Sequence, residues 1–208
     1  MLEAQSLAAR RGYATLFRDV RFSLRPGEAL VVTGPNGSGK TTLLRMLAGL
    51  TAPFEGEVRW RGEPVAPFAQ ALRDALLFNG HSSALKDELS AEENLDAWLR
   101  LDGERVASEV IAQALADVGL ARQRRLPARV LSQGQRRRIA LARLRLASRP
   151  LWILDEPATA LDTDGLAMLA ALVDAHLDGG GLCVAATHQA LVLQSTRAQS
   201  LVLHAAVA

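Results

Sequence analysis

The sequence is poor in cysteine and has no long hydrophobic run, and both absences exclude classes of protein. Cys183 is the single cysteine among 208 residues, so the chain has no disulfide framework, which fits a reducing compartment. Because Cys183 lies in the apolar run Leu182–Ala186, we expect a buried thiol rather than a reactive one. No apolar stretch approaches the roughly 20 residues of a membrane-spanning helix, and the N-terminus lacks the basic and apolar regions of a signal peptide. We therefore expect any membrane role to depend on partner proteins.

The chain also has little net charge. Its 24 Lys and Arg residues are balanced by 22 Asp and Glu residues, which leaves a formal net charge of +2. Nothing in this balance requires a nucleic-acid partner. An apolar content of 49% is enough for a packed core. With no internal repeat, low-complexity tract or long linker, the sequence favours one compact domain.

The apolar runs predict strands on both sides of a glycine-rich loop. The run Ala29–Thr33 predicts a strand, and Thr41–Ala48 predicts a helix that ends at Gly49. Shorter strand-like patterns, one after this helix and two before the loop, indicate a small antiparallel layer. These patterns lie at Thr15–Phe17, at Val20–Leu24 and at Glu57–Trp60, the last expected to be an edge strand.

The second half of the chain predicts helices and then two buried strands. From about Ser90 to Ala147 apolar residues recur at helical spacing, which indicates a helical subdomain. Leu151–Leu154 and Leu182–Ala186 are almost wholly apolar, as expected of parallel strands covered on both faces, and Asp162–Leu177 is a candidate helical crossover. The predicted fold class is therefore α/β.

A phosphate-binding loop follows the first buried strand. The run Gly34-Pro35-Asn36-Gly37-Ser38-Gly39-Lys40-Thr41 fits G-x-x-x-x-G-K-[ST] between a strand and a helix. Glycines let the backbone wrap phosphate oxygens, so that successive N–H groups meet the negative charge. We expect Lys40 to reach the β and γ phosphates of ATP, Thr41 to ligate Mg²⁺, and Thr42 to lie beside the nucleotide. A glycine-rich loop without a ligand is the weaker alternative.

Two adjacent carboxylates follow the strand Leu151–Leu154. Beside a phosphate site, Asp155 is expected to hold Mg²⁺ and Glu156 to polarise the attacking water as a general base. By itself, an apolar strand followed by Asp-Glu usually marks only the solvent end of the strand. The phosphate loop elsewhere in the chain favours the catalytic interpretation.

A third motif, Leu131-Ser132-Gln133-Gly134-Gln135, precedes a long helical stretch that ends before Pro150. A small polar loop at a helix N-terminus suits a γ-phosphate. It equally suits an ordinary N-cap by Ser132. The segment taken alone leaves both interpretations open.

In order and spacing, these motifs resemble the ABC ATPase family, together with Ala160-Leu161-Asp162 and Thr187-His188. The resemblance implies a P-loop NTPase core with an antiparallel β layer, and a helical subdomain at about 82–147 inserted in the RecA-like core of one ABC domain, 1–208. It implies ATP and Mg²⁺ as cofactors. It also implies a homodimer in which the loop Ser132, Gln133, Gly134, Gln135 of one subunit closes over ATP on the phosphate loop of the other. Asp162 would belong to the loop linking the two sites, and His188 would contact the γ-phosphate.

Two positions depart from the family pattern. The family usually has glutamine in the loop that joins core and helical subdomain, where it senses the metal and contacts the transporter, and His81 is the aligned residue. An imidazole can still donate or accept toward a metal-bound water, and a structural loop residue is the alternative. The usual adenine-stacking aromatic is unassigned, because Tyr13 is offset in register and Phe17 suits core packing better.

The departure at His81 narrows the resemblance. Gly80-His81, Leu85-Lys86 and Glu93-Asn94-Leu95 are similar to the ATPase subunits of the haem exporters of cytochrome c biogenesis. This implies peripheral attachment to the cytoplasmic face of a bacterial inner membrane through channel subunits of the CcmB and CcmC type. ATP hydrolysis would then serve a haem chaperone indirectly, in haem delivery or release.

Two other functions stay open. One is the ATPase of an ABC transporter for another small substrate. The other is a soluble ABC ATPase that binds nucleic acid through its arginine clusters, Arg122–Arg125 and Arg136–Arg138. Such proteins generally carry two ATPase cassettes or long insertions, and a solvated helix face is the commoner meaning of an arginine cluster. No nucleic-acid partner is therefore expected.

Overall fold

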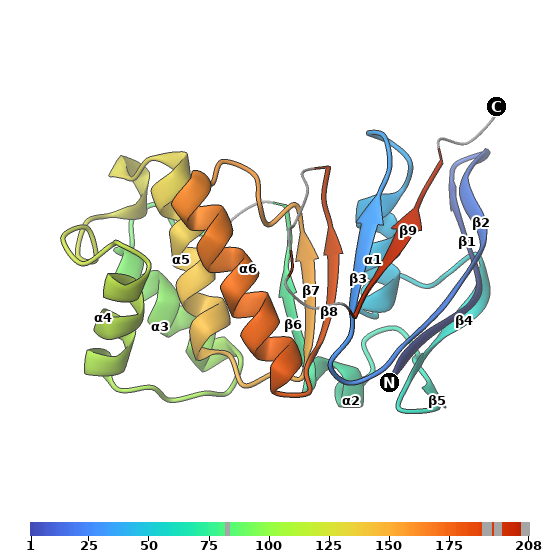
Figure 1. The fold of residues 1–208 in the computed structure, drawn as a ribbon, viewed down its shortest axis with the longest axis horizontal. Helices are drawn as coiled ribbons and strands as arrows, with labels where there is room; N and C mark the ends of the chain where they lie inside the picture. The colour runs from blue at the N-terminus through green and yellow to red at the C-terminus, as the bar shows by residue number, and fades with distance from the viewer. Residues whose placement is uncertain (82–83, 189–192, 194–196, 205–208) are drawn as a thin grey trace. The chain divides into compact units, whose positions relative to one another are not determined.

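A computed structural model describes residues 1–81, 84–188, 193 and 197–204. The chain forms two compact units (Figure 1). The first comprises Met1–Asn79, Arg149–Glu156 and Val173–Ala208, and the second comprises Gly80–Ser148 and Pro157–Leu172. The predicted helical subdomain starts at residue 82, which lies outside the described residues, and did not include the segment Pro157–Leu172. The division into a core and an inserted subdomain stays a prediction.

Strands predominate in the first part of the described chain, and a run of helices precedes the last three strands. In chain order they are β1 (Leu2–Arg11), β2 (Ala14–Leu24), β3 (Ala29–Thr33), α1 (Lys40–Leu47), β4 (Glu55–Trp60), β5 (Glu63–Pro64), α2 (Gln70–Arg73), β6 (Leu76–Asn79), α3 (Ala91–Leu101), α4 (Ser108–Asp117), the 3₁₀ helix η1 (Ala128–Val130), α5 (Gln133–Leu146), β7 (Leu151–Asp155), α6 (Thr163–Asp178), β8 (Leu182–Ala186) and β9 (Ala198–Val202).

The first unit contains two sheets, and the predicted α/β class is confirmed. One sheet has the strand order β6-β7-β8-β3-β9, and every described pairing in it is parallel. Every residue of β7 and of β8 is buried, as their apolar runs predicted. The predicted helix after the glycine-rich loop is α1, and the predicted crossover is α6. Strands β6 and β9 were not predicted, because each is short and half exposed.

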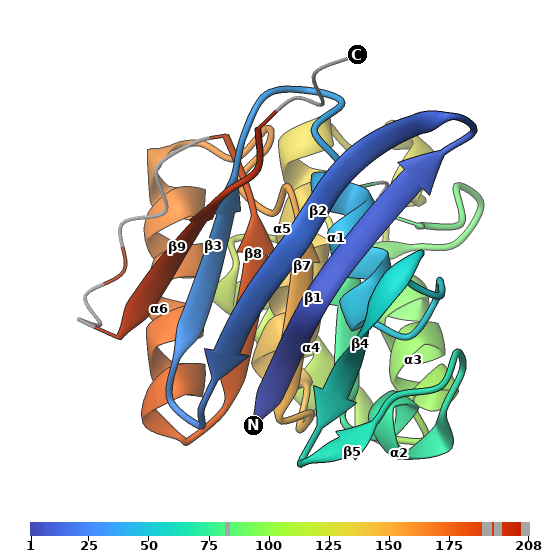
Figure 2. The same cartoon turned by 90° about the vertical axis from the view of Figure 1, so that its right-hand side faces the viewer.

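The antiparallel layer has the order β2-β1-β4-β5. Figure 2 shows β1 between β2 and β4. The two short strands predicted before the loop are one strand, β2, and its partner β1 was not predicted. The predicted edge position of Glu57–Trp60 is wrong, because β4 pairs with β1 on one side and with β5 on the other. The actual edge is β5, where Pro64 has no N–H group to offer a further strand.

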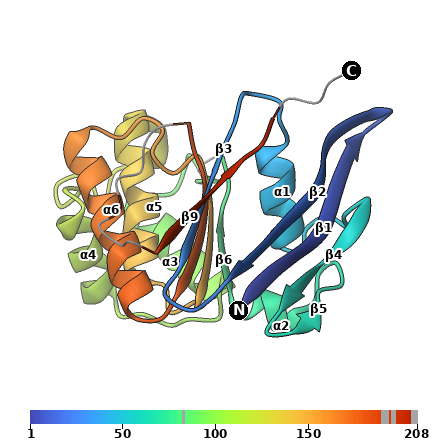
Figure 3. The ribbon, with the colours of Figure 1, turned by 45° about the vertical axis from the view of Figure 1, so that its right-hand side comes forward.

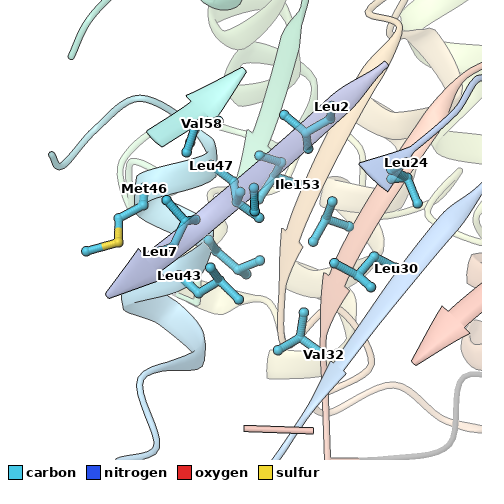
Figure 4. Close-up of a cluster of buried hydrophobic side chains, with 14 of the residues drawn as sticks. Leu2, Leu7, Leu24, Leu30, Val32, Leu43, Met46, Leu47, Val58 and Ile153 are labelled. Carbon is cyan, nitrogen blue, oxygen red and sulfur yellow. The ribbon is translucent and has the colours of Figure 1, made fainter. Parts of the chain in front are cut away.

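The core of the first unit lies around α1, between its two sheets (Figure 3). Helix α1 buries Leu43, Leu44 and Leu47, which lie four and three residues apart and so share one helix face. Figure 4 shows how strand side chains meet this face. Those labelled there and wholly or almost wholly buried include Leu2, Leu7, Leu24, Leu30, Val32 and Ile153. The packing fixes the helix that begins at Lys40.

The second unit is built on α3, α4 and α5, which pack against one another (Figure 1). The helical patterns of the sequence fall within these three helices. Ser90 and Glu93 form a capping box at the start of α3, which satisfies two backbone N–H groups that would otherwise lack partners. Among the described residues, no helix combines the length and the hydropathy needed to cross a bilayer.

The single cysteine is an inert core residue, as predicted. Cys183 is 1% exposed in β8, and burial raises the pKa of its thiol to about 12. A thiol with that pKa holds almost no thiolate near neutral pH, and the thiolate is the reactive form. The expectation of a buried, unreactive thiol is confirmed.

His176 lies in α6, and burial shifts the pKa of its ring. Its ring stacks on Trp152 with ring centroids 3.8 Å apart and 6° between the planes. Its Nε2 lies 3.2 Å from the carbonyl oxygen of Leu182. Burial lowers the pKa of His176 below its ordinary value of 6.5, although the Leu182 carbonyl opposes the shift. The folded state therefore favours the neutral imidazole.

This shift predicts a loss of stability in mild acid. Above the unfolded-state pKa of 6.5 both states are neutral and the stability is complete. As the pH falls through 6.5 toward the lower folded-state pKa, the unfolded chain binds a proton first and the free energy of unfolding decreases. Urea denaturation at about pH 7.5 and about pH 5.5 should show a larger decrease for the wild type than for His176→Phe. The matched control His204→Asn, at an exposed histidine, should keep the wild-type pH dependence. Equal decreases for wild type and His176→Phe would contradict the assignment.

Candidate functional site

Three of the predicted motifs lie in the first unit, at the carboxyl-terminal ends of the strands of the parallel sheet. The phosphate loop follows β3, Asp155 ends β7, and His188 comes shortly after β8. Strand β8 lies between β7 and β3. Because the carboxyl ends of parallel strands share an edge, side chains far apart in sequence meet there.

Two glycines give the phosphate loop its close-packed path. Gly34 has φ +146°, and a Cβ on it would lie 2.2 Å from the carbonyl oxygen of Leu203. Gly39 has φ +97° at the N-cap of α1, and a Cβ there would come within 2.9 Å of the Phe17 ring. Side chains at either position would strain the backbone and push the loop away from its support. The contact with Leu203 was missed, because the sequence does not show that the strand β9 ends under the loop.

Lys40 is 8% exposed, and its ammonium group lies at the loop. Nζ donates to the carbonyl oxygens of Gly34, at 2.8 Å, and of Pro35, at 3.2 Å. An ammonium group has three N–H donors, so two loop carbonyls leave one donor for a further acceptor. The positive charge is thereby held beside the backbone N–H groups at the start of α1.

Thr41 and Asp155 form a hydrogen-bonded oxygen pair at the carboxyl ends of the same strands. Thr41 Oγ1 donates to Asp155 Oδ2 at 2.8 Å, across 114 residues of sequence. Asp155 is 1% exposed. Its Oδ1 and the Oγ of Ser38 are buried without a hydrogen-bond partner among the described residues. Buried polar oxygens normally have partners, and these two are suited to a cation or a ligand group.

These oxygens suit Mg²⁺, which needs few protein ligands, better than they suit a metal that takes all of its ligands from the protein. In the described part of the chain, no group of three or more His, Cys, Asp or Glu residues is close enough to hold a metal. Mg²⁺ prefers oxygen ligands and is commonly held by one or two carboxylates, with waters and phosphate oxygens completing its shell. Thr41 and Asp155 provide such a partial set.

Glu156 and His188 form a second polar pair at the same edge. Glu156 has φ +53°, an uncommon value for a residue with a side chain, and its N–H donates to Ala186 O at 2.8 Å. Its Oε1 lies 2.9 Å from His188 Nδ1, with the Glu156 side chain 9% exposed and that of His188 55% exposed. An ionised carboxylate only accepts hydrogen bonds, so it pairs with the His188 tautomer that carries its proton on Nδ1. The pair is oriented by the ends of β7 and β8.

The other predicted site residues lie in the second unit. Ser132 caps α5: its Oγ accepts from Gln135 N at 3.2 Å, and Gln135 Oε1 accepts from Ser132 N at 2.9 Å. The capping interpretation of Ser132 is thus confirmed, and its role toward ATP stays a prediction. Asp162 precedes α6, where its Oδ1 accepts from Gly165 N at 2.9 Å. His81 is exposed, and its function also stays a prediction.

The three arginines Arg136, Arg137 and Arg138 have a role that the sequence did not reveal. Arg136 forms an ion pair with Asp87, Arg137 donates to the carbonyl oxygen of His81, and Arg138 forms an ion pair with Asp162. The partners are 49, 56 and 24 residues away along the chain. No local pattern indicates such distant partners. Arg136 and Arg137 therefore hold two points of the connection between β6 and α3, and Arg138 holds the segment before α6.

The structure describes both aromatic residues considered for adenine stacking. Tyr13 is fully exposed, whereas Phe17 is 8% exposed and belongs to the core cluster. The expectation that Phe17 packs in the core is confirmed. The adenine-stacking residue stays unassigned.

Comparison with known proteins finds similar sequences and similar folds. The model of the family described as "ABC transporter" matches residues 17–159. The chain is 49% identical over 197 residues to a cytochrome c biogenesis ATP-binding export protein, CcmA, of Pseudomonas aeruginosa, covering 95% of this chain and 97% of that protein. It is 45% identical over 203 residues to the CcmA of Nitrosomonas europaea, covering 98% and 95%. Among solved structures it is similar to the dimeric ATP-binding cassette MJ0796 in a post-hydrolysis state with ADP and Pi. That match has a TM-score of 0.76 and 25% identity, and covers 91% of this chain and 88% of the cassette.

Proposed function

This chain belongs to the ABC transporter family of ATP-binding proteins, and we propose that it hydrolyses ATP for the haem-handling complex of cytochrome c biogenesis. The proposal is supported by relatives named cytochrome c biogenesis ATP-binding export protein CcmA, which are 45% and 49% identical to the chain and are covered over 95% and 97% of their length. One structural observation carries the ATPase assignment. Five polar side chains gather at the carboxyl-terminal ends of the strands of the parallel sheet, and they belong to Lys40, Thr41, Asp155, Glu156 and His188. Cation, metal ligands and carboxylate base are the groups that phosphoryl transfer to water requires.

The residues of the first unit take distinct roles in this proposal. Lys40 and the loop N–H groups bind the β and γ phosphates. Thr41 Oγ1 and Asp155 would hold Mg²⁺, which neutralises phosphate charge when bound. Glu156 accepts a proton from the attacking water, and His188 orients the Glu156 carboxylate through Nδ1 and contacts the γ-phosphate.

The second unit supplies the other half of a composite site in a homodimer. The family resemblance and the dimeric cassette MJ0796 support an arrangement in which Ser132, Gln133, Gly134 and Gln135 of one subunit close over ATP on the partner. An arrangement with twofold symmetry is the commonest for such pairs. Closure on ATP and opening after hydrolysis would supply mechanical work.

The proposed setting is the cytoplasmic face of a bacterial inner membrane. There the ATPase would attach peripherally to integral membrane subunits of the CcmB and CcmC type, and would serve a haem chaperone indirectly. His81 would lie in the loop facing those subunits. The names of the relatives support this setting.

One alternative loses part of its support. A nucleic-acid role rested on two arginine clusters, and in the second of them Arg136, Arg137 and Arg138 donate to groups of their own subunit. Guanidinium groups already paired with a carboxylate or carbonyl are less available to phosphates. Transport of another small substrate remains the second candidate, because ABC ATPases that serve different substrates share the same ATP-hydrolysing domain.

Replacing Glu156 by glutamine tests the base. Glu156→Gln keeps the shape of the side chain and removes the acceptor charge, so turnover should fall about 10²–10⁴-fold. Binding of a fluorescent ATP analogue should persist, because Lys40 and Thr41 are unchanged. ATP should then trap a closed dimer, seen by size-exclusion chromatography with light scattering. Glu63→Gln, at an exposed position of β5, is the matched control and should hydrolyse ATP normally. Normal turnover by Glu156→Gln would remove Glu156 from the base role.

Asp155 tests the metal site. In the wild type, ATP with Mg²⁺ should raise the melting temperature more than ATP with a chelator, because bound ligands stabilise the folded state by mass action. Asp155→Asn presents a neutral oxygen and should lose this Mg²⁺-dependent increase while keeping the metal-free one. Asp164→Asn, at an exposed residue of α6, should behave as the wild type. The same Mg²⁺-dependent increase in Asp155→Asn would exclude Asp155 as a ligand.

The cellular pathway is tested by Lys40. Lys40→Ala removes the cation at the phosphate loop, so the parent organism carrying only this variant should lose its c-type cytochromes. Haem staining and absorbance spectra of its membranes measure the loss, with protein abundance checked by immunoblot. A strain that carries Arg100→Met, which alters only an exposed ion pair on α3, should assemble cytochromes. Unimpaired cytochromes in the Lys40→Ala strain would refute the haem pathway, though not the ATPase activity.

A further inference from the structure

Arg138 joins three segments of the second unit. From α5, its Nη2 donates to both carboxylate oxygens of Asp162, at 2.8 and 3.0 Å. Its Nη1 donates to the carbonyl oxygen of Val118, at 2.9 Å, just beyond α4. A Cβ on Gly119 would lie 3.0 Å from that nitrogen, so the chain is packed around the guanidinium group. The Arg138 side chain is 16% exposed.

The Asp162 carboxylate is engaged within its own subunit. Besides Arg138, its Oδ1 accepts from Gly165 N at 2.9 Å, which caps the start of α6. The backbone N–H of Gly165 and the Arg138 guanidinium lower the pKa of this carboxyl. The segment Ala160–Asp162 is thereby fastened at its end to two helices of the same subunit.

The segment Ala160–Asp162 also contacts the Ser132 loop, by which we mean Ser132–Gln135, the N-cap and first turn of α5. A Cβ on Gly134 would lie 3.1 Å from the carbonyl oxygen of Ala160, so only glycine allows this approach without displacement. Ala160 has φ +62°, which is unfavourable for a residue with a Cβ. Backbone in such a conformation persists only where its surroundings hold it. Arg138 and Gly134 lie one helical turn apart on α5 and provide that support from one helix face.

We infer that Arg138 is a positioning residue that holds the Ala160–Asp162 segment against the Ser132 loop, so that each subunit presents both to its partner's nucleotide as one preformed surface. The inference rests on the proposed dimer. A guanidinium fork fixes a carboxylate in distance and in angle, which a lysine cannot do. A surface ordered before association avoids the cost of ordering it on closure.

This role differs from a contribution to folding. The Asp162 side chain is 66% exposed, and an ion pair with one end open to solvent contributes little to the free energy of unfolding. The Arg138 side chain is 16% exposed and also bonds the carbonyl of Val118, so its loss lowers the melting temperature as well. Loss of the Asp162 charge leaves the bond to Val118 in place and should alter the geometry of the presented surface much more than the melting temperature. The ATP-binding residues of the first unit are untouched by the change.

Two variants separate geometry from folding. Arg138→Met keeps the stem of the side chain and removes the fork, and Asp162→Asn keeps a helix-capping oxygen and removes the charge. Each should bind a fluorescent ATP analogue as the wild type does, while ATPase turnover falls about 10- to 100-fold. With Glu156→Gln added, each should need more ATP to form the trapped dimer. Arg138→Lys should recover only part of the turnover, and Arg100→Met is the exposed-pair control with wild-type turnover. Wild-type turnover by both Arg138→Met and Asp162→Asn would overturn the inference.

A mixed dimer shows on which subunit Arg138 acts. One subunit carries Lys40→Ala and an affinity tag, and the other carries Arg138→Met and a different tag, so that tandem purification isolates the pair. If Arg138 positions groups for the partner, one of the two sites is intact. That site combines the phosphate loop of the Arg138→Met subunit with the Ser132 loop of the Lys40→Ala subunit. Turnover should then exceed that of either homodimer several-fold. If Arg138 instead serves its own subunit's phosphate loop, neither site is intact, and turnover no higher than that of the homodimers would refute the inference.

The two proposals fail in distinguishable ways. A wild-type protein without ATPase activity would refute the proposed function. An active wild type whose mixed dimer shows no recovery would refute only the positioning role of Arg138.

Discussion

In the parallel sheet the carboxyl-terminal ends of the strands lie side by side. Every group proposed to act on ATP in the first unit depends on that alignment. The hydrogen bond from Thr41 to Asp155 joins the helix after β3 to the end of β7, with β8 between the two strands. The Glu156–His188 pair joins the ends of β7 and β8 in the same way. Sheet register thus sets distances that no single loop could maintain, because loops alone lack the packing that fixes position. The buried side chains under α1 keep this register by filling the space between the two sheets.

Much of this site could be predicted because its parts are local in sequence. The phosphate loop, the Asp155-Glu156 pair and the apolar strands before them each fit within a few residues, so spacing and hydrophobicity suffice. Strand order is not local, which is why β4 was wrongly expected at an edge and why the support of Gly34 by Leu203 was missed. Ser132 shows a further limit, since the same residue type serves as a helix cap and as a candidate ligand group.

The arginines of α5 show how composition can mislead. As a sequence, Arg136–Arg138 is a cluster of positive charge, which suggests solvent or phosphates. In the structure, two of these guanidinium groups bond to the connection between β6 and α3, and the third bonds to Asp162 before α6. Guanidinium groups suit this use because they stay charged and donate in fixed directions. Residues adjacent along a helix point in different directions, which lets one short run reach separate segments.

The lysine of the phosphate loop has a consequence for how the charge of the loop is held. Lys40 Nζ donates to Gly34 and Pro35 of its own loop, so two loop carbonyls replace water around the ammonium group. In the proposed function, a phosphate would accept from the third N–H donor while these two bonds persist. The side chain is thereby ordered before the nucleotide arrives, and binding does not have to immobilise a long, mobile cation.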